Sequence, residues 1–288
     1  MSASAPPLSE HLSQLAPAYD AVLSDVWGVV HNGIAAFPAA CDALMRFRRE
    51  GKAVVLITNA PRPGEVVAKL LDKLAVPREA YDAIVSSGDV TRAVIASRPG
   101  KNLFHIGPER DLPIFEGLGV KFVPLAQADY VVCTGLTNDE IETPETYRPL
   151  LTEVSERGLF MLCANPDMVV ERGDRLLHCA GALADLYGEL GGEVLYAGKP
   201  HAPIYELAME RVAAARGETP LSRVLAIGDT VRTDLTGAVQ NGLDCLFVTA
   251  GIHAEELGHR DNPDLTTLNG MFAAAGVKPR AVTRRLAW

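Results

Sequence analysis

The chain has 288 residues, 48% of them hydrophobic and 22% charged, which suffices for the core of one large globular domain or two ordinary ones. Its formal net charge is −9 and it has no long run of lysine or arginine, which argues against a surface for nucleic acid or anionic membrane. No apolar run approaches the roughly 18 residues that a membrane span needs.

Short apolar runs that end at polar residues or glycine dominate the first and last thirds of the chain. Near-continuous aliphatic and β-branched runs of this kind are typical of strands that are buried on both faces. The predicted strands cover residues 21–24, 53–57, 83–85, 224–228 and 246–249.

The segments between these strands have helical spacing or good helix formers. The predicted helices cover residues 39–49, 64–74, 89–96, 202–216 and 234–241. Alternating strands and helices predict an α/β fold, a doubly wound parallel sheet with right-handed crossovers. Ligands of such sheets bind beyond the carboxyl ends of the strands. Asp25, Thr58, Ser86 and Asp229 all follow or end predicted strands at that edge.

The middle of the chain has strand and helix candidates of its own. Apolar runs occur at 103–106, 130–133 and 159–163, and helical segments at 144–157 and 180–190. We expect residues 99–195 to form an inserted α/β cap domain, with hinges near Gly100 and Gly191-Gly192. Residues 1–98 and 196–288 would then form the core domain.

Polar motifs at the predicted edge suggest chemistry, although each has a simpler explanation. Asp25 and Gly28 could form only a turn, and Thr58 could only start a helix. Lys199 could be a solvated side chain. The Asp229 and Asp234 pair could converge on one hard cation such as Mg²⁺, or Asp234 could only cap a helix; these two roles are compatible.

The order of these motifs resembles that of the haloacid dehalogenase superfamily, specifically its class IIA branch of capped phosphatases, which includes 4-nitrophenylphosphatase and pyridoxal phosphatase. The resemblance spans almost the whole chain. Its core motifs are DVWGVVHNG, LITNAPR, YAGKP and IGDTVRTDLTGA, and VSSGD and CANPD also look like segments of this branch.

The resemblance implies a nucleophile, phosphate contacts and a metal site. Asp25 would attack phosphorus and become an aspartyl-phosphate, and Lys199 would neutralise the growing charge. Thr58 would hydrogen-bond the phosphoryl group, with Asn59 supporting the loop. The other predicted substrate contacts near this edge are Gly28 and Arg62. The predicted Mg²⁺ ligands are Asp25, Asp229, Asp234 and the backbone carbonyl of Trp27.

Trp27 departs from the family pattern, because most family phosphatases have a second aspartate at this position. That aspartate protonates the leaving oxygen and later activates water, which is typically worth about 10²–10⁴-fold. His31 could supply the proton instead, or it could be a loop residue that faces the cap. Alternatively, the substrate has a good leaving group or provides its own acid.

Two other functions remain open. The protein could bind phosphorylated ligands and turn them over poorly. It could also be a dehalogenase, since superfamily dehalogenases carry an aromatic residue at the position of Trp27. Dehalogenases work without metal, however, which would leave Asp229 and Asp234 without a purpose.

The cap is expected to govern substrate choice, and its substrate is expected to be a small phosphorylated metabolite. The candidate contacts are Asn165, Asp167 and Arg172, followed by His105 and Arg110, each of which could instead be a surface or turn residue. His178 and Cys179 are expected to pack internally. Dimerisation through the cap is common in this branch.

The amino terminus has neither a basic start nor an apolar stretch typical of a secretory signal. The five cysteines are odd in number and scattered without metal-binding spacing, so a reducing cytoplasm is expected. They are Cys41, Cys133, Cys163, Cys179 and Cys245.

Overall fold

The computed structural model describes residues 6–98, 100–172, 175–258 and 262–288. The chain forms two compact units, which are treated separately below. The first comprises Met1–Thr58, Ala68–Val85 and Tyr205–Trp288, and the second comprises Asn59–Val67 and Ser86–Ile204. The domain boundaries predicted from the sequence, residues 99–195 for the cap and the rest for the core, differ from these bounds. The division into a core and a cap domain remains a prediction. Pro99, at the predicted start of the cap, lies outside the described residues.

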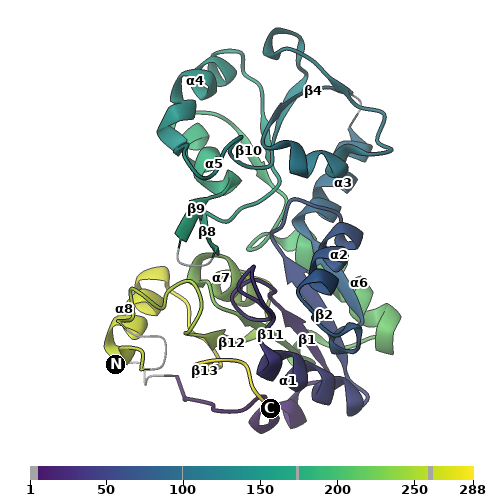
Figure 1. Ribbon diagram of the computed structural model, residues 1–288, viewed down its shortest axis with the longest axis vertical. Helices are drawn as coiled ribbons and strands as arrows, with labels where there is room; N and C mark the ends of the chain where they lie inside the picture. The colour runs from purple at the N-terminus through teal and green to yellow at the C-terminus, as the bar shows by residue number, and fades with distance from the viewer. Residues whose placement is uncertain (1–5, 99, 173–174, 259–261) are drawn as a thin grey trace. The chain divides into compact units, whose positions relative to one another are not determined.

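The first unit is built on a six-stranded sheet in the order β13-β12-β11-β1-β2-β3. Strands β1, β2 and β11 run side by side in its middle (Figure 1). Every residue of β2 is buried, as expected for a parallel strand covered on both faces. The strands are β1 (Ala21–Ser24), β2 (Ala53–Thr58), β3 (Ala83–Ser86), β11 (Val224–Gly228), β12 (Asp244–Val248) and β13 (Ala281–Thr283).

The register of the central strands decides which residues leave the sheet together. Ser24 of β1 is aligned with Ile227 of β11 on one side and with Leu56 of β2 on the other. Asp25, the next residue, therefore emerges at the same sheet edge as the ends of β2 and β11.

The principal helices follow strands, as the alternation predicted. Pro38 occupies the first turn of α1, where its missing N–H costs no hydrogen bond, and three arginines near the end of α1 complement the helix dipole. The bounds are α1 (Pro38–Arg49), α2 (Gly64–Lys73), α3 (Ser87–Ser97), α6 (Ala202–Arg216), α7 (Thr236–Gln240) and α8 (Leu265–Ala275).

The second unit contains a five-stranded sheet in the order β10-β7-β6-β4-β5, with parallel pairing throughout. Helices α4 (Arg148–Glu156) and α5 (Ala180–Glu189) pack against it around Tyr187 and Leu183 (Figure 1). The strands are β4 (Asn102–Ile106), β5 (Lys121–Phe122), β6 (Tyr130–Cys133), β7 (Met161–Cys163) and β10 (Val194–Tyr196). An antiparallel pair, β8 (Val169–Arg172) and β9 (Arg175–His178), was not among the predicted elements.

Short helical turns complete both units. They are η1 (Leu12–Gln14), η2 (Ala16–Ala18), η3 (Arg78–Ala80), η4 (Glu109–Phe115), η5 (Leu125–Gln127), η6 (Pro144–Tyr147), η7 (Leu221–Arg223) and the π-helical turn η8 (Val231–Leu235).

The helix predicted over residues 234–241 is observed as α7, and residues 234 and 235 belong instead to the π-helical turn η8. The Thr236 hydroxyl donates to the carbonyl oxygen of Val231 at 2.7 Å, and the Leu235 N–H donates to the carbonyl of Thr230, five residues back. The Thr236 backbone N–H also donates to the Val231 carbonyl, so the turn is closed by bonds that reach five residues back, as in a π-helix. The α/β fold class itself is confirmed.

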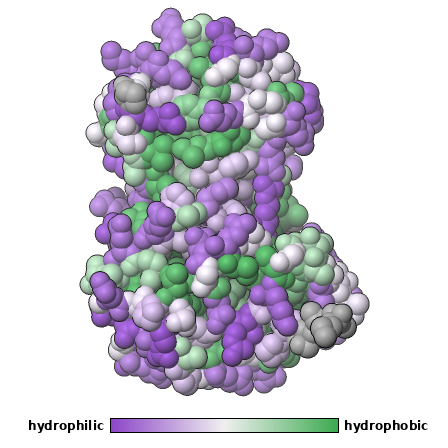
Figure 2. Space-filling view, turned by 180° about the vertical axis from the view of Figure 1, so that it is seen from behind, coloured by the Kyte–Doolittle hydropathy of each residue, from purple (hydrophilic) through white to green (hydrophobic). Residues whose placement is uncertain are grey.

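Large apolar side chains also reach the surface, among them Ile141 and Phe122. Figure 2 shows hydrophobic residues on one face in patches among hydrophilic ones. Within the described ranges, none of the helices is both long and apolar enough to cross a membrane.

Candidate active site

Three aspartates of the first unit form a buried cluster. Asp25 follows β1, Asp229 follows β11, and Asp234 lies in η8. One carboxylate oxygen from each can be chosen so that all three lie within 4.8 Å of one another. None of the three residues is more than 6% exposed. The structure thus brings together the three carboxylates predicted to hold the metal.

Two glycines make room for the Asp229 carboxylate. Gly28 has a φ of +85°, and a Cβ atom at Gly28 or at Gly251 would collide with the Asp229 side chain. The Ile252 N–H, next to Gly251, donates to Asp229 Oδ2 at 2.8 Å. Gly28, predicted as a substrate contact, is therefore the residue that lets the loop after β1 approach this carboxylate.

Asp234 combines the two roles considered for it. Its Oδ2 accepts the N–H of Thr230, which precedes η8, at 3.1 Å. It therefore satisfies a backbone donor at the start of the turn while its carboxylate belongs to the cluster. Thr230 also donates its hydroxyl to Asp229 Oδ1 at 3.2 Å, which links the two carboxylates through one residue.

The donor set fits a hard divalent cation. Three ionised carboxylates so close together repel one another strongly when shielded from water, and a cation removes that repulsion. Oxygen-only donors are the ligands that Mg²⁺ and Ca²⁺ prefer.

Trp27 and His31 lie together in the loop after Asp25. Their rings meet edge to face, with centroids 5.0 Å apart. The indole lies so close to Gly33 that a Cβ atom there would collide with it. An indole in this position cannot act as the family's proton donor.

His31 is buried, and its Nδ1 accepts the N–H of Gly33 at 2.9 Å. Burial lowers the pKa of His31 to about 4, so the ring is neutral at pH 7 and carries its proton on Nε2. A neutral ring whose lone pair is taken by the loop backbone is a weak proton donor. These contacts suit the alternative in which His31 is a loop residue.

Thr58, the last residue of β2, is buried in the first unit. In the second unit, the Asn59 side chain joins two predicted motifs. Its Nδ2 donates to Asp167 Oδ1 at 2.9 Å and to the Lys199 carbonyl at 3.2 Å, while its Oδ1 accepts the Lys199 N–H at 2.8 Å. Asn165 joins this group, because its Oδ1 accepts the Asp167 N–H at 3.1 Å.

Arg62, predicted as a substrate contact, is paired within the second unit. Its Nε donates to Asp111 Oδ1 at 2.9 Å, and the Asp111 side chain is only 3% exposed. Burial raises the pKa of Asp111, and the positive charges of Arg62 and Arg110 oppose that shift. Asp111 was not among the predicted site residues.

The remaining cap candidates have partners of their own. His105 hydrogen-bonds Thr134 through Nε2 at 2.9 Å, and Arg110 pairs with Asp139. Arg172 is exposed and lies 3.8 Å from Glu140. Cys179 is buried, as expected, and His178 ends β9 partly buried.

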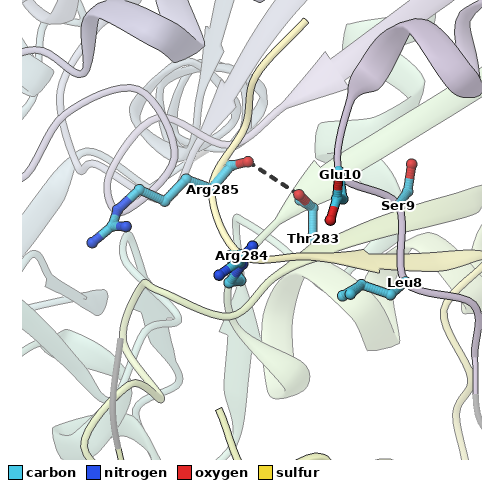
Figure 3. A pocket seen from close by; sticks show the side chains of 6 residues that line it. All are labelled: Leu8, Ser9, Glu10, Thr283, Arg284 and Arg285. Carbon is cyan, nitrogen blue, oxygen red and sulfur yellow. Dashed lines mark hydrogen bonds between the residues drawn. The ribbon is translucent and has the colours of Figure 1, made fainter. Parts of the chain in front are cut away.

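A pocket near both ends of the described chain contains none of the predicted site residues. The segment at Leu8 pairs with Val282 of β13. Thr283 donates its hydroxyl to the carbonyl of Arg285 at 3.0 Å (Figure 3). The pocket is lined by Leu8, Ser9, Glu10, Thr283, Arg284 and Arg285.

Two family models match this chain. The model described as haloacid dehalogenase-like hydrolase matches residues 22–121, and the HAD-hydrolase-like model matches residues 196–270. A solved hydrolase of the haloacid dehalogenase-like family from Brucella suis 1330 is 48% identical, covers 97% of this chain and 100% of its own, and has a TM-score of 0.87. The chain belongs to the haloacid dehalogenase-like family.

Curated relatives extend this finding. The 5'-nucleotidase YutF of Bacillus subtilis is 25% identical over 83% of this chain and 90% of its own. The ribonucleotide monophosphatase NagD of Escherichia coli K12 is 24% identical over 80% and 88%. The resemblance to class IIA of the haloacid dehalogenase-like family is thereby confirmed, and the protein is a hydrolase of that family.

Proposed function

We propose that this protein is a Mg²⁺-dependent phosphatase that hydrolyses a small phosphorylated metabolite through an aspartyl-phosphate on Asp25. The observation that carries the proposal is the buried cluster of Asp25, Asp229 and Asp234 at the carboxyl edge of a parallel sheet. Ligands of parallel α/β sheets bind at this edge, and the relatives named above are phosphatases.

The proposed reaction has two displacements. A carboxylate oxygen of Asp25 forms a bond to phosphorus while the bond to the ester oxygen breaks. That oxygen leaves as an anion if it is a good leaving group, or it takes a proton from water or from an acidic group of the substrate. Water then attacks the phosphorus of the aspartyl-phosphate, which frees Asp25 and releases orthophosphate. Asp25 can approach a doubly negative ester only if positive charge offsets the repulsion.

The proposed cation would be held by Asp25, Asp229, Asp234 and the carbonyl of Trp27, and would supply part of that positive charge. Lys199 would supply the rest, and Thr58 would donate to the phosphoryl oxygens. The hydrogen bonds of the Asn59 side chain to the backbone of Lys199 support the proposal that Asn59 orders the loop that carries Lys199.

The substrate class is proposed from the cap and the relatives. Both curated relatives are named for activity on nucleotides, so nucleoside monophosphates are the first substrates to test. Asn165, Asp167 and Arg172 are the proposed contacts from residues 99–195, which we propose as the cap domain. The link from Asp167 to Asn59 favours Asp167 as the first of these to vary.

A second candidate function is a phospho-ligand-binding protein with weak turnover. The observation that favours it is the Trp27 and His31 pair, which offers no good proton donor in the loop after Asp25. A dehalogenase is less well supported, because it would leave the Asp229 and Asp234 carboxylates buried without a function.

Orthophosphate release from nucleoside and sugar monophosphates, with Mg²⁺ and with EDTA, tests the proposal. We expect release by the wild type that stops on chelation and falls at least about 1,000-fold in Asp25→Asn, because the nucleophile is lost. Asp42→Asn, an exposed aspartate paired with Arg46, is the control and should retain activity. Ligand binding without release of orthophosphate would favour the second candidate instead.

A further inference from the structure

The turn after β12 contacts residues 229–234 of the first unit, which carry Asp229 and Asp234, at two places. At one, the Ile252 N–H donates to Asp229 Oδ2. At the other, the N–H of Val231 donates to Nε2 of His253 at 3.3 Å. His253 did not emerge from the sequence, although it follows Ala250-Gly251 at the carboxyl edge of a predicted strand.

Both ring nitrogens of His253 are engaged. Nδ1 lies 2.9 Å from Glu256 Oε2, and the ring stacks on Phe247 of β12 with centroids 6.3 Å apart. Since Nε2 accepts a backbone N–H, the proton of the neutral ring must be on Nδ1, where it donates to Glu256. The Glu256 carboxylate thus favours the His253 tautomer whose Nε2 can accept the Val231 N–H.

Val231 is the first residue of η8, so its N–H has no acceptor within that turn. The His253 ring supplies the acceptor that this N–H needs. The same turn carries Asp234. The turn after β12 therefore holds Asp229 directly, through Ile252, and holds the segment that carries Asp234 indirectly, through His253.

We infer that His253 and Glu256 form a positioning pair that orients the carboxylates of Asp229 and Asp234 for a divalent cation. The inference rests on the proposed function only in that the aspartate cluster binds such a cation. Residues that orient metal ligands typically contribute about 10–100-fold to metal affinity. The pair itself contributes no ligand.

Metal binding measured without substrate tests this inference. The full-length chain, stripped with EDTA and dialysed, is titrated with Mn²⁺ and followed by electron paramagnetic resonance, and with Mg²⁺ by calorimetry. We expect His253→Ala to weaken binding by about 10–100-fold and Glu256→Gln to weaken it less, because the ring remains. His253→Gln should recover part of the loss, since its amide oxygen can accept the Val231 N–H.

Glu256→Gln keeps the test decisive if His253→Ala does not fold, because the Glu256 side chain is 63% exposed. Glu255→Gln is the matched control and should bind Mn²⁺ as the wild type does. Weaker binding at an unchanged melting temperature of the metal-free protein supports the inference. Wild-type affinity in folded His253→Ala and Glu256→Gln would overturn it, as would a wild type that binds neither cation. Metal binding without phosphatase activity would instead count against the proposed function alone.

Discussion

Trp27 stands two positions after the proposed nucleophile, where the family resemblance implies a proton-donating aspartate. Its indole is held by the loop, against Gly33 and edge-on to His31. An ester with a weakly acidic alcohol as leaving group needs a proton on the departing oxygen, whereas a nitrophenolate leaves without one. Trp27 therefore predicts a strong preference for good leaving groups.

Replacing Trp27 with aspartate should reduce that preference. We expect Trp27→Asp to raise kcat/KM for an alkyl phosphate by about 100-fold relative to 4-nitrophenyl phosphate, because the new carboxyl can protonate the poorer leaving group. The ratio of the two substrates is measured on the same sample, so losses from repacking cancel. Trp27→Phe, which adds no proton donor, should leave the ratio unchanged. An equal change for both substrates in Trp27→Asp would contradict the prediction.

At the scale of elements, one ion pair links the segment after β2 to the turn η4. Arg62 lies in residues 59–67 and Asp111 in η4, and both belong to the second unit. The Ser86 hydroxyl also donates to the carbonyl of Arg62 at 2.6 Å, which ties the same segment to the start of α3. These contacts give Arg62 a structural role that does not depend on substrate.

Removing Arg62 should destabilise the protein more than removing an exposed partner does. Arg62→Ala leaves the buried Asp111 carboxylate without its guanidinium, and we expect a loss of about 2–4 kcal/mol in the free energy of unfolding. Arg78→Ala, which breaks the exposed pair with Asp72, is the control and should change it little. Denaturant unfolding measures both. Equal effects would mean that the Arg62 pair behaves like a surface pair.

At the scale of the whole molecule, Asp20 joins distant parts of the first unit. Its carboxylate accepts two hydrogen bonds from Arg223, each at 2.8 Å, and lies 3.4 Å from Arg216 at the end of α6. The Asp20 N–H donates to the Arg223 carbonyl, so the starts of β1 and β11 are aligned here. Hydrogen bonding by Arg223 lowers the pKa of Asp20 to about 2.

This pKa predicts how stability depends on pH. A carboxyl whose pKa is lower in the folded chain stabilises it above the unfolded pKa of about 4, and this contribution disappears as pH falls towards about 2. We expect Asp20→Asn to lower the melting temperature at pH 6–7 and the difference from wild type to shrink below pH 4. Thermal unfolding across this range measures it. A difference that does not change with pH would exclude a charge effect.

Much of the fold follows from local pattern. Apolar runs such as 53–57 predict parallel strands because only strands covered on both faces are apolar throughout. Asp25 and Asp229 could be placed at one edge because parallel strands end together. The β8–β9 pair was missed, because its residues include charged Glu171 and Arg172 and give no clear strand pattern.

The sequence by itself determined the α/β alternation, the family and the order of the polar motifs along the sheet edge, since these depend on neighbouring residues. The tertiary structure alone decided that Arg62 pairs with Asp111, that His31 is buried and neutral, and that His253 holds the loop of Asp229. Those outcomes depend on distance and burial between segments far apart in the chain. Periodicity and spacing carry no information about either, because packing brings such segments together only once the whole unit folds.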